Sequence, residues 1–310
     1  MKRKGFTLVE LLVVIAIIAL LMGILMPALA RVKQIANRLV CGTNLSGIGK
    51  AMMIYSVDNS EQYPRAGGRN ATWSTTGVIK KWDADTEKGA FGQNATITSS
   101  FYLLIKYSDL TPKQFICKGD VGTNPFLLSD YTSTTAEKIT DPWDFGMQPA
   151  LCVSFAYHMP YGDETGRSFA LASPSNPSSP ILSDRSPYLD TNADAYKNDA
   201  NPELPDGPDW DTVASSYIDK DRTGNAAAHQ RDGQNVLFND SHVGFEKYPN
   251  LGVEHDNIFL AWRSETATTD EDKQVKGWYP DKVGDYAPKS VKDAYLVNED
   301  QDTVGKKPTK

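Results

Sequence analysis

Residues 4–30 read KGFTLVELLVVIAIIALLMGILMPALA, and this stretch decides how the chain is organised. It holds no polar side chain between Leu11 and Met26. A helix rises about 1.5 Å per residue, so ~20 residues cross the ~30 Å hydrocarbon layer of a bilayer. Three basic residues precede the apolar run, and the soluble bulk of the chain follows it. The positive-inside rule therefore predicts a cytoplasmic N-terminus and an exported C-terminal domain.

Glu10 is the acidic residue in this stretch. A charge at the centre of a membrane helix costs on the order of 2.5–3.5 kcal/mol, and less near an end, whereas each Leu, Ile, Val or Phe returns about 0.3–0.6 kcal/mol. Fifteen such residues lie from Phe6 to Leu29, so insertion tolerates Glu10 without explaining it. Cleavage after Gly5 would create a partner, the new ammonium group of Phe6, in the same chain or in a neighbouring copy.

Residues 4–18 resemble the leader and N-terminal motif of type IV prepilins and type II secretion pseudopilins nearly residue for residue. The resemblance implies that a prepilin peptidase cuts between Gly5 and Phe6 and methylates Phe6, and that Glu10 helps assembly. It implies that Pro27 loosens or kinks the helix, its freed carbonyl being satisfied by neighbouring helices. The implied partners are this peptidase, other copies or pilin-like subunits, and an inner-membrane assembly platform.

Two other interpretations compete with this one. A general secretory signal peptide would end at a small-residue site, which Ala28-Leu29-Ala30 supplies, but the apolar run is too long for it. A plain single-pass anchor explains the length and the orientation but not the residues around Glu10. Sequencing the mature N-terminus separates the three interpretations, because they predict N-methyl-Phe6, Arg31 and Met1 respectively.

The helix is expected to continue beyond the apolar run. After Ala30, apolar residues recur every three or four positions to about Tyr55, which predicts an amphipathic helix with one face available to a sheet. Gly42, Gly47 and Gly49 weaken it locally. A helix from Phe6 to about Asp58 would be ~80 Å long. Pilins have this plan, so the expected fold is α+β: a long helix, half transmembrane and half amphipathic, packed on an antiparallel β-rich domain.

Beyond residue 60, short apolar runs separated by turn residues favour strands and loops. Residues 101–107 predict a short helix, and residues 115–117, 152–157 and 180–184 predict strands. Residues 234–246 predict a hairpin around the polar turn 239–242. The predicted segments are a leader (1–5), an assembly helix (6–30), its amphipathic half (31–60), a globular domain (61–265) with a loop insertion at about 186–224, and a partly flexible C-terminal extension (266–310).

Two further blocks extend the resemblance to a subgroup of large pilin-like proteins. Residues 41–58 contain Cys-x-x-Asn-Leu and Tyr-x-x-Asp, and Tyr-Pro follows at 63–64. Near the C-terminus, the subgroup has a histidine followed after nine residues by Asp-Gly. Here ten residues separate His229 from Asp240, and Ser241 stands in place of the glycine, so a different turn is expected.

Charge and cysteine content limit the remaining functions. The chain has 32 basic and 39 acidic residues, and loss of the leader leaves 29 against 39, a net charge of −10. Such an acidic product is not expected to bind nucleic acid. Of the three cysteines, Cys117 and Cys152 are the candidate disulfide in an exported domain, while Cys41 would stay free or join one of them.

No catalytic motif accompanies the histidines and carboxylates that could be assembled into a site, so we expect no enzyme activity and no catalytic residue. Those residues are His158, His229, His242, His255, Asp184 and Asp240. A structural Ca²⁺ ion is a further expectation, because the loops are rich in oxygen ligands, but no ligand set can be named and the metal ligands are unknown.

The sequence therefore predicts a single-pass protein of the inner (cytoplasmic) membrane whose globular domain is exported to the periplasm or the cell surface. Its expected function is that of a filament subunit, in a type IV pilus or a type II secretion pseudopilus. The alternative is a membrane-tethered exported binding protein that uses the prepilin processing signal without forming a long fibre. Replacing Glu10 by Ala discriminates between the two.

Overall fold

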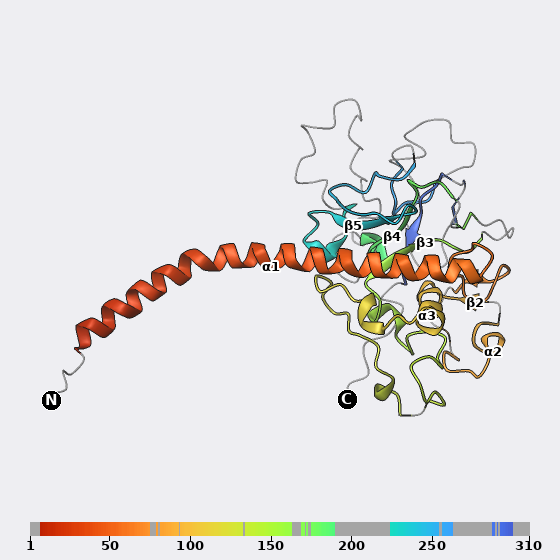
Figure 1. The fold of residues 1–310 in the computed structure, drawn as a ribbon, viewed down its shortest axis with the longest axis horizontal. Coiled ribbons are helices and arrows are strands. Elements are labelled where there is room, and N and C mark those ends of the chain that lie inside the picture. Colours follow the sequence, from red (N-terminus) through yellow and green to blue (C-terminus); the bar gives the residue numbers. More distant parts are fainter. Residues whose placement is uncertain are drawn as a thin grey trace, which may run out of the picture.

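The computed structural model describes residues 7–74, 79, 81–92, 94–132, 134–162, 169–170, 172, 175–189, 224–253, 256–262, 287–288, 290 and 292–299. The chain begins with one long helix, α1 (Leu8–Asp58), and the described residues after it form a head domain. Figure 1 shows α1 running out of this domain, so that the start of the helix lies far from it. The α+β layout expected from the sequence is confirmed.

The head domain contains a five-stranded antiparallel sheet among the described residues. Its strands are β3 (Phe155–His158), β4 (Pro180–Asp184), β5 (Gln234–Phe238), β6 (Val243–Glu246) and β7 (Leu296–Val297), in the order β6-β5-β4-β3-β7. The predicted bounds of β4 are confirmed, as is the β5–β6 hairpin. In the hairpin turn, Ser241 takes a φ of 74°, the left-handed conformation that glycine favours.

Strands β3, β4 and β5 are buried on both faces of this sheet, with alternate side chains pointing to opposite faces. Phe155, Tyr157 and Leu237 point into the main core, which α1 also lines. Ala156 and Val236, which are neighbours of these residues along β3 and β5, point into a second core that includes residues 258–260. Strand β4 is buried at every position because it is central in the sheet.

Helix α3 (Ile97–Tyr107) packs against α1 and begins four residues before its predicted start. Thr96 and Ser99 form a capping box there, with the Ser99 N–H donating to Thr96 Oγ1 at 3.0 Å and the Thr96 N–H donating to Ser99 Oγ at 3.0 Å. The other short elements are β1 (Thr72–Trp73), α2 (Glu87–Phe91), β2 (Asn94–Ala95) and the 3₁₀ turns η1 (Pro112–Phe115), η2 (Leu128–Asp130), η3 (Pro149–Leu151), η4 (Pro187–Leu189) and η7 (Ala227–His229).

The strand predicted at residues 115–117 is wrong, because Phe115 is the last residue of η1. Pro112 opens this turn with its fixed φ, and the Thr111 N–H donates to Gln114 Oε1 at 2.8 Å. These local interactions favour a 3₁₀ turn over an extended strand. Apolar residues alone did not reveal the difference.

The second half of α1 buries one stripe against the sheet and α3. The stripe contains Cys41, Leu45, Ile48, Met52 and Ser56, spaced three or four residues apart. Gly49 lies beside it, and a Cβ atom there would stand 2.6 Å from Leu237 Cδ2. Glycine at this position therefore lets α1 approach β5 closely. The sequence analysis considered only its low helix propensity and did not predict this packing role.

The predicted segment boundaries fall partly outside the described residues. Residues 190–223 of the predicted insertion and most of the predicted C-terminal extension lie there. Within that extension, Leu296 and Val297 form β7 and pair with β3. Two residues of the predicted extension are thus part of the sheet.

Candidate assembly helix and its junction with the head domain

The first half of α1 exposes apolar side chains around its whole circumference. Leu8, Leu20 and Leu29 expose 78%, 67% and 68% of their surface. Among the described residues, α1 is the helix long and apolar enough to cross a membrane, and its most apolar window has no buried residue. A helix that is apolar all round and uncovered by its own domain requires lipid or other helices as its surroundings.

Glu10 closes the N-terminus of α1 through a capping box with Thr7. The Thr7 N–H and hydroxyl donate to Glu10 Oε2 at 2.9 and 2.7 Å, and the Glu10 N–H donates to Thr7 Oγ1 at 3.3 Å. The carboxylate thus has a local structural role that the sequence analysis missed, although the T-x-x-E spacing signals it. Gly5 and Phe6 lie outside the described residues, so their roles stay predictions.

Pro27 lies inside α1 without ending it. A proline lacks the N–H that would bond to the carbonyl four residues earlier, and its ring crowds that carbonyl. The residue four positions earlier is Gly23, whose position offers open space around a Cβ atom. Figure 1 shows that the first half of α1, which is free of contacts with the head domain and which we call the free half, curves gently and does not break.

Polar contacts hold α1 at the point where it leaves the head domain. Arg38 forms an ion pair with Asp232, and its guanidinium carbon lies 4.4 Å from the centre of the Phe245 ring. One turn earlier, Gln34 Nε2 donates to Gln230 Oε1 at 2.8 Å. These contacts anchor the helix to the loop before β5 and to β6.

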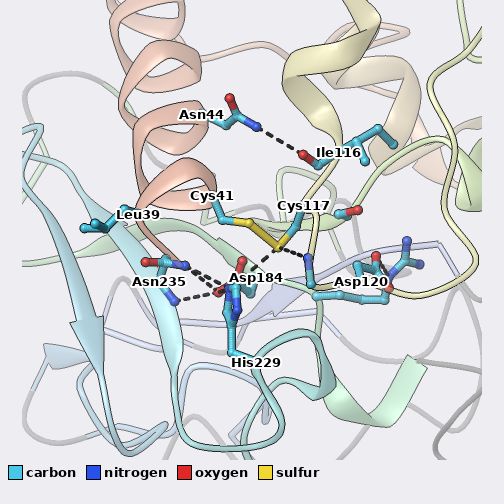
Figure 2. Close-up of a disulfide and its surroundings, with 12 residues drawn as sticks. Leu39, Cys41, Asn44, Ile116, Cys117, Asp120, Asp184, His229 and Asn235 are labelled. Carbon is cyan, nitrogen blue, oxygen red and sulfur yellow. Dashed lines mark hydrogen bonds and ion pairs between the residues drawn. A yellow bond between two sulfur atoms is a disulfide. The ribbon is translucent and has the colours of Figure 1, made fainter. Parts of the chain in front are cut away.

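A disulfide between Cys41 and Cys117 crosses the same junction, with Cα atoms 5.1 Å apart. The candidate Cys117–Cys152 pair is therefore wrong, and the structure has the alternative in which Cys41 joins Cys117, so that Cys152 takes no part in the bridge. The physical reason is that the apolar stripe of α1 turns Cys41 toward the head domain, where residue 117 follows η1. Figure 2 shows the bridge joining the helix to the Cys117 segment, with Asn44 donating to the Ile116 carbonyl at 3.0 Å one turn along.

Three polar side chains lie against this disulfide, fully or almost fully buried (Figure 2). His229 Nε2 lies 3.6 Å from Cys117 Sγ and 3.2 Å from Asp184 Oδ2. Asn235 donates to Asp184 Oδ2 from its backbone N–H at 2.6 Å and from Nδ2 at 3.0 Å, and Nδ2 is 3.1 Å from His229 Nε2. We call Cys41, Cys117, Asp184 and His229 the junction cluster.

Comparison with known proteins adds to this geometry. Residues 1–26 match a family model described as the prokaryotic N-terminal methylation motif. The chain is also 46% identical over 57 residues to a protein of Thermus thermophilus named type IV wide pilus major component PilA4. That match covers 18% of this chain and 44% of the relative, so the chain spans less than half the length of this relative. No solved structure matches the chain.

The chain is type IV prepilin-like. The family model falls on the N-terminal motif, and among the described residues α1 is the helix that could cross a membrane. The family model covers the first 26 residues of the chain, and the alignment with the pilin relative covers 57 residues.

The remaining sequence candidates of this prepilin-like chain are scattered. His158 is buried in β3, where its Nε2 lies 3.3 Å from the Asp293 carbonyl and burial lowers its pKa to about 4. His242 is exposed in the hairpin turn, with Nδ1 2.5 Å from Asp240 Oδ1 and its ring stacked on Phe238. Hydrogen bonds from His242 lower the pKa of Asp240. His255 lies outside the described residues.

Among the candidate histidines and aspartates, the structure therefore brings together two His–Asp pairs, and each pair has a local structural role. The His242–Asp240 pair fixes a turn, and the His229–Asp184 pair is buried behind a disulfide. The sequence analysis left the pairing of Cys41 open and missed Asn235 as a member of the junction. The position of Cys41 in the buried 41–45–48–52 stripe of α1 favours its pairing with the head domain, whereas Asn235 carries no local signal. The Ca²⁺ site in the loops stays a prediction.

Proposed function

We propose that this chain is a filament subunit of the type IV pilus or type II secretion pseudopilus kind. A prepilin peptidase cuts it between Gly5 and Phe6 and methylates Phe6. The free half of α1 then leaves the inner membrane and packs against the same segment of other subunits, on an assembly platform, with the head domain outside the cytoplasm. The observation that carries the proposal is that the first half of α1, which begins with the prepilin-like motif, has no buried residue in its most apolar window.

The charge of Glu10 gives this proposal a sharp test. In the precursor, Glu10 caps its own helix, and Gln at the same capping-box position would do so too. In the filament, the carboxylate pairs with the ammonium group of Phe6 on a neighbouring subunit, which Gln cannot do. Burial of both groups between packed helices makes such a pair sensitive to the loss of one partner.

The experiment compares Glu10→Gln, Glu10→Ala and Thr7→Val in cells lacking the wild-type chain. Thr7→Val is the matched control, because it removes the hydroxyl of the cap and keeps the carboxylate. We expect both Glu10 variants to remain in the membrane fraction and to lose about tenfold or more of the sheared filament signal. Thr7→Val should keep most of it. Antibody to the head domain detects both fractions.

Each other outcome contradicts a stated part of the proposal. Normal assembly of Glu10→Gln would contradict the proposed ion pair between Glu10 and Phe6. Helix capping would then be the role of Glu10. Unchanged function of Glu10→Ala, with no filaments from the wild type, would favour the membrane-tethered binding protein. An intact Met1 or a mature Arg31 at the N-terminus would exclude processing at Gly5. A structural Ca²⁺ ion, proposed separately, requires a melting temperature that falls with chelator.

A further inference from the structure

The junction cluster places four metal-binding side chains around one point. The Sγ atoms of Cys41 and Cys117, a carboxylate oxygen of Asp184 and a ring nitrogen of His229 all lie within 4.8 Å of one another. Two sulfurs, one imidazole and one carboxylate form a ligand set that Zn²⁺ accepts, with four ligands in a tetrahedron. In such a site the two thiolates would stand about 3.8 Å apart, given Zn–S bonds of about 2.3 Å. The spread of the four atoms is compatible with that size.

Asp184 is not fully satisfied by its protein neighbours. Its Oδ2 atom accepts two hydrogen bonds from Asn235, but its Oδ1 atom is buried and has no hydrogen-bond partner among the described residues. A buried carboxylate oxygen without a partner is costly, and a cation removes that cost. The disulfide beside it offers no positive charge and no donor. The orphaned oxygen therefore points to a ligand that the oxidised junction does not hold.

The surroundings support the ligands as they would around a metal ion. The Gly119 N–H donates to Cys117 Sγ at 3.4 Å, a contact that favours thiolate. Asn235 fixes the Asp184 carboxylate and contacts His229. Gly119 also has no room for a side chain, since a Cβ atom would stand 2.1 Å from the Ala228 carbonyl oxygen. This close approach keeps Cys117 and His229 together, and such outer contacts orient metal ligands.

We propose that the dithiol form of this chain binds one Zn²⁺ ion through Cys41, Cys117, Asp184 and His229. Binding releases the two thiol protons and leaves two thiolates, one carboxylate and one neutral imidazole on the ion. The disulfide and the ion exclude each other, because both use the same two sulfur atoms. The ion would hold α1 on the head domain before the cysteines are oxidised, and the disulfide holds it afterwards. This inference does not require that the chain forms filaments.

The test uses the full chain in detergent, first oxidised and then reduced with a water-soluble phosphine. The phosphine takes an oxygen atom from water to become its oxide, and the disulfide receives two electrons and two protons to become two thiols. Each form is equilibrated with Co²⁺, as a visible probe, and then with Zn²⁺ in competition with a chromogenic chelator. We expect the reduced chain to bind one ion, with thiolate-to-cobalt charge-transfer absorption, and the oxidised chain to bind none at this site.

Variants identify the ligands. Asp184→Asn and His229→Gln should each weaken metal binding by about tenfold or more. Cys41→Ser leaves one thiolate, so the thiolate-to-cobalt absorption should fall below the intensity expected for two thiolates. Cys152→Ser is the control and should bind one ion as the wild type does. Formation of the Cys41–Cys117 disulfide in oxidised Asp184→Asn and His229→Gln reports that these variants fold.

Two results would overturn the proposal. The first is the same metal content in the oxidised and the reduced wild-type chain, a comparison that needs no variant. The second is unchanged affinity in both folded Asp184→Asn and folded His229→Gln, since the ion would then be held by the two thiols alone.

Discussion

The two halves of α1 are one continuous helix in opposite surroundings. Leu25, in the first half, exposes 63% of its surface, whereas Leu45, in the second half, is fully buried. The first half is apolar on every side, and the second half is apolar along one stripe that the head domain covers. Both halves are α-helical, so the distribution of apolar residues around the axis determines what each half packs against.

The largest expected effect comes from the same substitution made in each half. Leu45→Ala should lower the free energy of unfolding of the head domain by about 2–5 kcal/mol, because it leaves a cavity in the core. Leu25→Ala removes the same atoms from an uncovered site and should leave that free energy unchanged. Denaturant unfolding of the full chain in detergent, followed by tryptophan fluorescence, measures both. Equal effects would contradict the division of α1 into two halves.

A pair of glycines in the second half sharpens the comparison. Gly49→Ala should destabilise the head domain by about 1–3 kcal/mol, because its Cβ atom would collide with Leu237 on β5. Gly47→Ala is the matched control, since its Cβ atom would lie 3.6 Å from Gln114 Nε2, at ordinary contact distance. It should be neutral or stabilising by up to about 1 kcal/mol. A neutral Gly49→Ala would show that the helix does not approach β5 as closely as described.

The head domain, and not the free helix, should make stability depend on pH through Asp144. Burial raises the pKa of this carboxyl group to about 7, although Thr96 Oγ1 and the Phe145 N–H donate to it. The folded state therefore binds the proton more tightly than the unfolded state, and stability falls as the pH rises from about 4 to about 7. The slope is about 1.4 kcal/mol per pH unit at most.

Asp144→Asn should abolish this contribution, so the unfolding free energy of the variant relative to wild type should rise with pH across that window. Asp141→Asn is the control. Hydrogen bonds from the Lys138 and Glu137 N–H groups lower the pKa of Asp141, so its contribution is lost only as the pH falls below about 4. A difference between Asp144→Asn and wild type that stays constant from pH 4 to pH 7 would contradict the prediction.

The smallest expected effect lies at the boundary between the two halves. Arg38→Gln removes the ion pair with Asp232. The side chains of Arg38 and Asp232 are 22% and 34% exposed, so the substitution should lower the free energy of unfolding by about 0.2–1 kcal/mol. The loss should shrink in high salt, because salt screens partly exposed charges. Arg31→Gln, on the exposed part of the helix, should have no measurable effect on the head domain. A salt-independent loss would mean that Arg38 acts through packing on Phe245.

Sequence patterns predicted the features that depend on neighbours along the chain. The long apolar helix, strand β4 and the β5–β6 hairpin were predicted from runs of apolar residues and from the polar turn residues that separate them. The junction could not be predicted in this way. Cys41 and Cys117 are 76 residues apart, and Asp184, His229 and Asn235 come from three further segments. Their meeting depends on how α1 crosses the sheet, which no local pattern encodes.

Misleading local signals account for the other differences. Gly49 has a low helix propensity, but its value here is the space it leaves for Leu237. Phe115 and Ile116 have apolar side chains suited to a strand, yet Pro112 and Gln114 favour a 3₁₀ turn. Glu10 was interpreted through a charge partner, and its cap on Thr7 was overlooked.

The bridge from Cys41 to Cys117 also determines how the chain would respond to mechanical tension. A pull between the free helix and any point after residue 117 passes through the covalent S–S bond and bypasses the 76-residue separation between the two cysteines. At about 3.4 Å per extended residue, the bridge withholds roughly 260 Å of contour length from stretching. The contacts of α3 and of the second half of α1 with each other are thus shielded from load for as long as the cysteines stay oxidised.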